Sequence, residues 1–310
     1  MTGSGDDMTI DFKNPFQQTG VWLKGNLHMH TTESDGKLSP HDAVKRYEDA
    51  GYGFIAITDH NKRTMPDVRT NGMLLIPGEE IDFNHNGCYH IVAVNTQRAI
   101  GLSPDEKKTI TPADVIARIR AAGGEAILAH PYWSNETIEQ TKLCAGVLGV
   151  EVYNHDCHVW HGSGHSMVHW DDMLRIGMRV NGFASDDAHA YSSTSTRPDD
   201  ALGGFTMVRA KERTPEAVME AIRAGYFYAS NGPEIKNVTI SGSTVSIETS
   251  PVKSVSFRTP HWNSVRYENT DGSLMTAVSH AIAHTMRIMR IECMDDKGRM
   301  AWTNPFWLSE

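Results

Sequence analysis

The stretch that decides the fold is residues 25–60, which read GNLHMHTTESDGKLSPHDAVKRYEDAGYGFIAITDH. A short strand is predicted to end in His28-Met29-His30, a helix to follow, and a second strand to end at Asp59-His60. Residues two apart in a strand point to the same face, so His28 and His30 are expected to share one metal ion. Asp35 and His60 would lie at the same rim. This unit is therefore predicted to supply the first part of a metal site.

The stretch around it continues as an α/β pattern from Val21 to about Ser230. Strands alternate with amphipathic helices, which indicates a parallel α/β architecture. Three helices are predicted to begin after Ser39, Thr111 and Thr214, because each hydroxyl can cap a helix and is followed by proline. The predicted strands are Phe54–Thr58, Met73–Ile76, Ile91–Val94, Ala126–Ala129, Val147–Tyr153, Val180–Ala184 and Phe205–Val208.

Most of these strands run into residues that can bind metal at their carboxyl ends. The endings read HMH, TDH, GEE, AHP, EVYN and SDDAH. In barrels of parallel strands the active site is built from those ends. His90 is the exception, because it precedes its strand. It can join the site only if that strand runs antiparallel or the loop before it folds inward.

The rest of the chain sets limits on compartment and partners. Residues 234–310 alternate polar and β-branched residues between turn signals, so we expect a small antiparallel β domain after a first domain of residues 1–233.

The formal net charge of -9 argues against a nucleic-acid or anionic-membrane surface. The sequence has no apolar run long enough for a membrane span and no signal peptide, which favours a cytoplasmic protein. The 4 cysteines form no CxxC pair, so neither a disulfide framework nor a thiolate zinc site is indicated.

The candidate metal ligands are all nitrogen or oxygen donors. Nine such ligands are too many for one zinc ion. Because none of them is a thiolate, they suit two or three divalent ions such as manganese, iron or zinc. Ions about 3.5–4 Å apart activate a bridging water and neutralise charge on a phosphoryl or carbonyl oxygen. The ligands are His28, His30, Asp35, His60, Glu80, His90, His130, Asp187 and His189.

Five ordered motifs in this set resemble the PHP family, the polymerase-and-histidinol-phosphatase metallohydrolases. They are HxH-x4-D (His28, His30, Asp35), TDH (Asp59, His60), GxE (Gly78, Glu80), AHP (Ala129, His130, Pro131) and DxH (Asp187, His189). The resemblance covers about residues 22–233 and implies a distorted (β/α)7 barrel with two or three metal ions. It assigns His28, His30, Glu80 and Asp187 to one ion, and Glu80, His90 and His130 to a second. Asp35, His60 and His189 would hold a third, although Asp35 stands where many members have histidine.

Downstream segments are similar to one two-domain PHP branch, which resembles carbaryl hydrolase. They are GVEVYN (Gly149–Asn154), WDDMLRIG (Trp170–Gly177), YASNGP (Tyr228–Pro233) and RMAWTNPFW (Arg299–Trp307). The family at large cleaves phosphoesters, whereas this branch includes a carbamate-ester hydrolase. The resemblance therefore leaves two ester chemistries open.

The resulting hypothesis is a hydrolase in which a metal-bridging hydroxide attacks a small phosphoester. The alternatives are a carboxylic or carbamate ester hydrolase with the same centre, and a non-catalytic PHP scaffold or binding module. Retention of all nine ligands speaks against the scaffold. The substrate, the metal and any homo-oligomeric state are left open by the sequence.

Two groups of residues are expected to act beside the metal ions. His60, His189 and His158 are the candidates for proton transfer to the leaving group. Lys62, Arg63, Asn154 and His155 are the candidates for binding substrate. Residues 155–169, HDCHVWHGSGHSMVH, are expected to form a loop over the active site.

Overall fold

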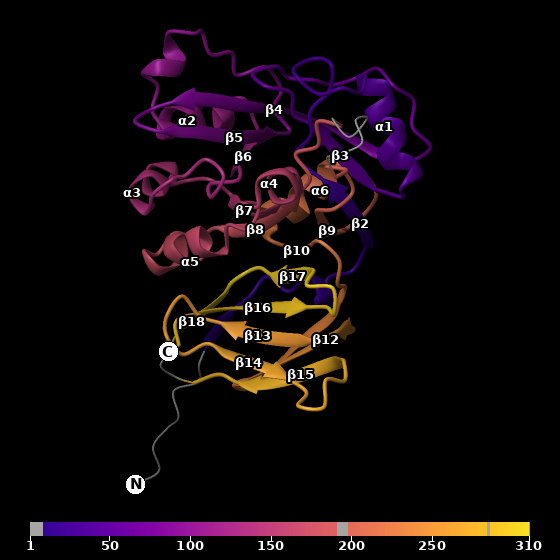
Figure 1. Cartoon of the computed structure of the whole chain (residues 1–310), viewed down its shortest axis with the longest axis vertical. Coiled ribbons are helices and arrows are strands. Elements are labelled where there is room, and N and C mark those ends of the chain that lie inside the picture. Colours follow the sequence, from indigo (N-terminus) through magenta and orange to yellow (C-terminus); the bar gives the residue numbers. More distant parts are fainter. Residues whose placement is uncertain (1–8, 191–197, 284–285, 310) are drawn as a thin grey trace.

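The computed structural model describes residues 9–190, 198–283 and 286–309. An α/β region occupies the upper part of the molecule in Figure 1, and antiparallel strands of the C-terminal residues occupy the lower part. No helix in the described ranges is long and apolar enough to cross a membrane.

The α/β region is built on one large sheet. Parallel pairing joins β2 to β3, β3 to β4, β6 to β7 and β7 to β8. β5 runs antiparallel to both β4 and β6, and β9 runs antiparallel to β2 and β10. The bounds are β2 Val21–Asn26, β3 Phe54–Ile57, β4 Leu74–Asn84, β5 Cys88–Val94, β6 Glu125–Leu128, β7 Gly149–Asn154, β8 Asn181–Ser185, β9 Phe205–Ala210 and β10 Phe227–Ser230.

The mixed α/β architecture is confirmed, but the expected distorted (β/α)7 barrel is not, because the sheet of the described residues stays open. β9 occupies the edge of β2 that β8 would need in order to close the ring. Within the described residues, β8 reaches β9 through a side chain, since Thr206 Oγ1 donates to the Ala184 carbonyl over 3.1 Å. The segments that follow β2 and β8 meet at a single isolated parallel bridge between Met29 and Ala188.

The three predicted helix starts are confirmed. In α1 Pro40–Asp49, α2 Pro112–Ala121 and α6 Pro215–Ala224, the hydroxyl before the proline accepts a backbone N–H from the first turn. The expected loop over residues 155–169 is instead largely helical, because it contains α4 His155–His161 and α5 Met167–Arg175. The shorter helical segments are η1 Pro15–Gln17, η2 Glu106–Lys108, α3 Ile138–Thr141 and η3 Lys142–Cys144.

The C-terminal strands pair antiparallel, as the alternating sequence predicts. β17 also pairs with β10, so the large sheet continues from the α/β region into this part of the chain. β1 Thr9–Asp11 pairs with β18 and adds the N-terminal segment to the same end. The bounds are β11 Ile235–Ser241, β12 Thr244–Val252, β13 Ser254–Arg258, β14 Val265–Glu268, β15 Met275–Ala281, β16 Ile288–Met294, β17 Met300–Thr303 and β18 Phe306–Ser309.

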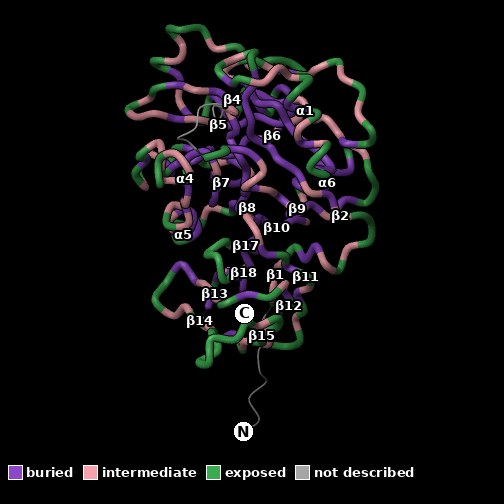
Figure 2. The backbone as a smooth tube through the Cα atoms, turned by 45° about the vertical axis from the view of Figure 1, so that its right-hand side comes forward, coloured by how far each residue is buried: buried purple, intermediate pink, exposed green. Residues whose placement is uncertain are grey.

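The central strands are buried along most of their length, as Figure 2 shows.

A buried ion cluster joins α5 to β16. Arg290 is 1% exposed and donates to Asp171 Oδ1 through Nε at 3.0 Å and Nη2 at 2.8 Å. It also pairs with Glu292, and its guanidinium lies 4.7 Å from the centre of the Trp170 ring. Such a pair is costly to break, because each buried charge depends on its partner.

Candidate metal centre

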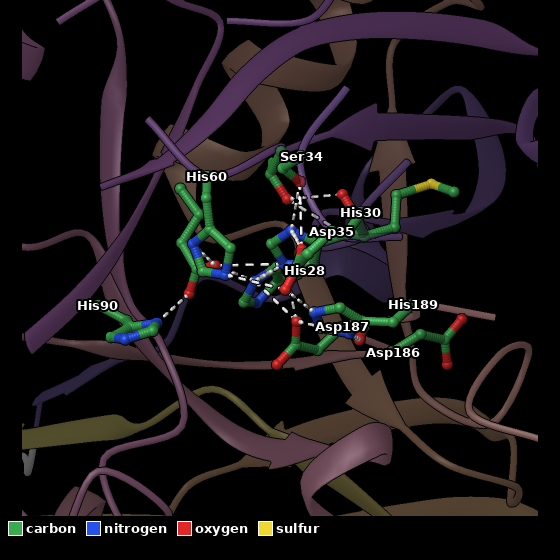
Figure 3. A network of polar contacts seen from close by, with 12 residues as sticks. His28, His30, Ser34, Asp35, His60, His90, Asp186, Asp187 and His189 are labelled. Atoms are coloured by element: carbon green, nitrogen blue, oxygen red, sulfur yellow. Dashed lines mark hydrogen bonds and ion pairs between the residues drawn. The ribbon is translucent and has the colours of Figure 1, made fainter. Parts of the chain in front are cut away.

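Two imidazoles and two carboxylates converge where β2 and β8 end. The Nε2 atoms of His28 and His30 lie 3.3 Å apart. Asp187 Oδ1 lies 3.1 Å from the first and 3.0 Å from the second. Glu80 Oε2 lies 3.3 Å and 3.2 Å from the same two atoms. All four residues are buried, and Figure 3 shows His28, His30 and Asp187 turned toward one another.

The second carboxylate oxygen of Glu80 faces a different pair of histidines. Glu80 Oε1 lies 2.8 Å from His90 Nδ1 and 3.3 Å from His130 Nε2. His90 reaches this position because β5 runs antiparallel to β4, one of the two conditions expected from the sequence. Glu80 thus presents one oxygen to each of two sets of histidines, which is the arrangement of a bridging carboxylate.

A third set gathers around Asp35 at the more exposed side. Asp35 Oδ2 lies 3.5 Å from His189 Nε2 and 3.9 Å from His60 Nε2. Ligand atoms of these three residues and His30 all lie within 4.8 Å of one another. His60 also approaches Glu80, with Nδ1 3.1 Å from Oε2. The structure therefore brings all nine predicted ligands to one place.

The donor set fits divalent metal ions. It consists of imidazole nitrogens and carboxylate oxygens, which suit manganese, iron and zinc. His60 Nδ1 and Asp187 Oδ1 are buried, yet they make no hydrogen bond of good geometry to the described part of the chain. Buried polar atoms are normally satisfied, so these two atoms point to a bound cation.

Glu151 is a supporting residue that the sequence reasoning missed. It lies on β7, and its Oε1 accepts a hydrogen bond from His28 Nδ1 over 2.8 Å. Its Oε2 accepts from the His130 backbone N–H at 3.0 Å and from Asn154 Nδ2 at 2.9 Å. A carboxylate that binds one ring nitrogen turns the other toward the metal. The available signal was a glutamate inside the otherwise apolar strand GVEVY, where an unpartnered charge would be costly.

We expect Glu151→Gln to weaken metal binding about 10- to 100-fold, the usual effect of losing an outer carboxylate partner. The amide cannot accept the His28 proton as strongly, so the ring is less well oriented. A Mn²⁺ titration of the metal-depleted protein measures the change. Glu139→Gln on exposed α3 is the control, and an unchanged affinity in Glu151→Gln would contradict the assigned role.

Burial and charge act against each other on the titratable groups here. Burial opposes the charged form of His30, but the Asp187 and Glu80 carboxylates raise its pKa to about 9. Burial likewise opposes ionisation of Glu80, yet the surrounding histidines His28, His90 and His60 lower its pKa well below the usual range. The metal-free site therefore holds imidazolium and carboxylate groups that neutralise each other.

This gives metal binding a definite pH dependence. A metal ligand must be deprotonated, and His30 loses its proton only near a pKa of about 9. We expect the apparent affinity for Mn²⁺ to rise up to tenfold per pH unit for each proton released, between pH 6 and 9. In the metal-free protein the same raised pKa stabilises the fold fully below about pH 6.5, and this contribution is lost as the pH rises toward 9. Titrations at several pH values test both signs, and a flat affinity profile would contradict them.

A cavity of about 190 Å³ opens onto these ligands. Its remaining wall consists of Trp133 and one face of α4. The Trp133 ring meets His130 and His90 edge-on, with centroids 5.0 and 5.7 Å away. The described residues that line it are Asp35, His60, Glu80, His90, His130, Trp133, Asp156, Cys157, Trp160, His161, Asp187 and His189.

The expected cationic substrate contacts lie outside this lining. Lys62 is exposed and paired with Glu33, and Arg63 Nε donates to the Thr96 carbonyl over 2.8 Å. Both side chains are thus directed to partners in the neighbouring loops. The structure does not bring either of them to the cavity.

The expected contacts from residues 154–158 are displaced because the segment is helical. His155 Nδ1 binds the Tyr153 hydroxyl at 2.8 Å, and the His158 ring lies against His165, with centroids 5.1 Å apart. Neither lines the cavity, since the helix turns Asp156, Cys157, Trp160 and His161 toward it instead. Asn154 is buried and donates to Asp187 Oδ2 over 3.1 Å, so it supports a metal ligand.

Comparison with known proteins relates this arrangement to solved structures. No protein-family model matches the chain. A two-domain protein from Bacteroides vulgatus, with a predicted PHP-like metal-dependent phosphoesterase, aligns with a TM-score of 0.51. The alignment covers 92% of this chain and 95% of that one, at 18% identity. This chain has a PHP-like fold.

Sequence relatives of the PHP-like chain cover shorter parts of it. The 5'-3' exoribonuclease Rnm of Salmonella typhimurium is 39% identical over 80 residues, which are 23% of this chain and 27% of that protein. The chain thus matches about a quarter of the length of that relative. An uncharacterized protein of Methanocaldococcus jannaschii is 27% identical over 126 residues, covering 36% of this chain and 68% of the relative.

Proposed function

We propose that this PHP-like protein is a metal-dependent hydrolase, and that it acts as a phosphoesterase on a small phosphoester. The observation that carries the proposal is the position of Glu80. Its two oxygens face separate sets of histidines within 3.3 Å. A carboxylate shared in this way is suited to hold two divalent ions close together.

The residues divide into the three sets that the family resemblance implies. His28, His30, Glu80 and Asp187 would hold one ion; Glu80, His90 and His130 a second; Asp35, His60 and His189 a third. Bound divalent ions supply an activated water and neutralise negative charge on a phosphoryl group. No Lys or Arg is among the described residues that line the cavity, so neutralisation of a phosphate would depend on the metal ions.

The rest of the cavity defines the substrate and proton-transfer positions. Its volume of about 190 Å³ fits a small molecule. Trp133 supports the His90 and His130 side and would contact the leaving group. His161 lines the cavity where His158 does not, so we assign it the proton transfer to the leaving group. His60 and His189 are alternatives for this role only when they are not bound to metal.

We also propose that the boundary between the two domains lies at residue 233. The described residues that line the cavity all come from the first part of the chain, before β11. The C-terminal residues 234–310 then form an antiparallel β domain. It contacts the first domain through the β10–β17 pairing and the Arg290 cluster.

The test compares substrates on one metal-depleted preparation, reloaded separately with Mn²⁺, Fe²⁺ or Zn²⁺. We expect one of the ions to restore hydrolysis of p-nitrophenyl phosphate above that of a phosphodiester or a short oligoribonucleotide. Faster cleavage of p-nitrophenyl acetate or an aryl carbamate would instead favour the carboxylic or carbamate ester hydrolase. Full turnover after chelation would overturn the metal-dependent mechanism, and less than one bound ion per chain would favour a non-catalytic module.

A further inference from the structure

Asp156 is a buried carboxylate in the cavity that none of the three ligand sets uses. It occupies the first turn of α4 and is 7% exposed. Its Oδ1 makes no hydrogen bond to the described residues, although the side chain lines the cavity. A buried carboxylate oxygen without a partner is costly, so a compensating cation in the cavity would stabilise the ionised form of Asp156.

The backbone around Asp156 fixes it beside the metal ligands. Its N–H donates to the Asp186 carbonyl over 2.8 Å, directly before the ligand Asp187. Asn154, which caps the same helix, donates to the Asp187 side chain. The first turn of α4 is thus held by the segment that carries two of the nine ligands.

The groups that face Asp156 show what kind of partner fits. One ligand atom each from Asp156, His189 and Asp200 lie within 4.8 Å of one another. Asp187 and Asp200 are negative neighbours that disfavour a further carboxylate charge, while His189 and His30 favour it. Asp200 is already bound to the backbone N–H groups of His189 and Ala190. A cation in the cavity would relieve the repulsion among these carboxylates.

We infer that Asp156 is a further metal ligand, which acts with His189 on the ion at the outer side of the cavity. His189 Nδ1 donates to the Asp187 carbonyl over 2.7 Å, and its other ring nitrogen, Nε2, lies 3.5 Å from Oδ2 of the proposed ligand Asp35. Asp156 adds a carboxylate oxygen to a set that otherwise offers one carboxylate, Asp35, and two histidines. The inference rests on the proposed metal centre and extends it to α4, so that the helix forming the cavity wall is also bound to the metal.

The experiment measures metal binding in the full chain. Metal-depleted wild type and Asp156→Asn are titrated with Mn²⁺ by calorimetry, and bound manganese is counted by elemental analysis after gel filtration. We expect the variant to lose its weakest Mn²⁺ equivalent, or to bind it at least about tenfold more weakly. His158→Gln on the opposite face of α4 is the control and is expected to bind as wild type. Circular dichroism confirms folding, and Asp156→Ser replaces a variant that does not fold.

The outcomes separate this inference from the proposed function. Unchanged stoichiometry and affinity in Asp156→Asn would overturn the inference. This holds even if kcat/KM falls, because Asp156 would then bind substrate or transfer a proton. If Asp156→Asn loses a Mn²⁺ equivalent that the wild type binds, the inference is supported. If the wild type at the same time hydrolyses none of the test esters, that result counts against the proposed activity.

Discussion

Glu80→Gln is expected to lower kcat/KM for the phosphoester by about a hundred- to a thousandfold, since removing a group that stabilises charge in a transition state has effects of this size. The substitution keeps the shape of the side chain but removes its negative charge. Both oxygens of Glu80 approach histidines of two ligand sets, so the variant weakens two ion sites at once. Steady-state kinetics with p-nitrophenyl phosphate and manganese analysis of the same sample measure the two losses together.

The adjacent residue provides a matched control. Glu79 is also buried on β4, but it points away from the cavity and accepts the Ile100 N–H over 2.8 Å. Glu79→Gln is expected to keep its metal stoichiometry and to change kcat/KM only a few-fold. More than a tenth of wild-type activity in Glu80→Gln, or an equal loss in Glu79→Gln, would contradict the choice between the two neighbours.

Arg290→Ala is expected to lower the free energy of unfolding by about 3–5 kcal/mol, the usual cost of removing one partner from a buried ion pair. The substitution leaves Asp171 and Glu292 without their main partner, and Arg258 reaches Asp171 Oδ2 only at 3.6 Å. It also removes the guanidinium that covers Trp170. Urea unfolding followed by tryptophan fluorescence measures the change.

Lys142→Ala, which removes a surface pair with Glu139, serves as the control for this measurement. Exposed pairs contribute little, so its unfolding midpoint should stay near that of wild type. A loss below about 1 kcal/mol in Arg290→Ala would show that the cluster does not stabilise the junction of α5 and β16.

The sequence was informative where ligand geometry depends on local spacing. The two-residue spacing predicted that His28 and His30 act together, and the Asp187-Ala188-His189 pair repeats it although Asp187 has a positive φ of 57°. Both pairs lie in the ligand clusters of the candidate metal centre. Helix starts at Ser39, Thr111 and Thr214 depend on contacts within one turn. His90 could be placed only conditionally, because the direction of β5 depends on its pairing with β4 and β6.

The structure departs from the expectations where distant parts of the chain decide the outcome. Barrel closure fails because β9 pairs with β2, and no local pattern in either strand reveals that competition. Glu151 and His28 meet although they are far apart in sequence. His158 was expected at the active site, and Asp156 was not singled out. Residues 155–161 form a helix, and its rotation turns Asp156 toward the cavity and leaves His158 outside the lining.

The single bridge between Met29 and Ala188 indicates that metal ions bound at this site would also stabilise the fold. Within it the Asp187 N–H donates to the His28 carbonyl and the His30 N–H to the Ala188 carbonyl, each over 2.9 Å. Ions held by His28, His30 and Asp187 would cross-link the two segments and close a very long loop of chain. The entropy cost of closing a loop rises only slowly with its length, so the great length of this loop adds little further cost. Ions that bind only the folded state would stabilise this contact by mass action. Amide hydrogen exchange at His30 and Asp187 would then report metal occupancy directly, with slow exchange in the loaded protein and faster exchange after chelation.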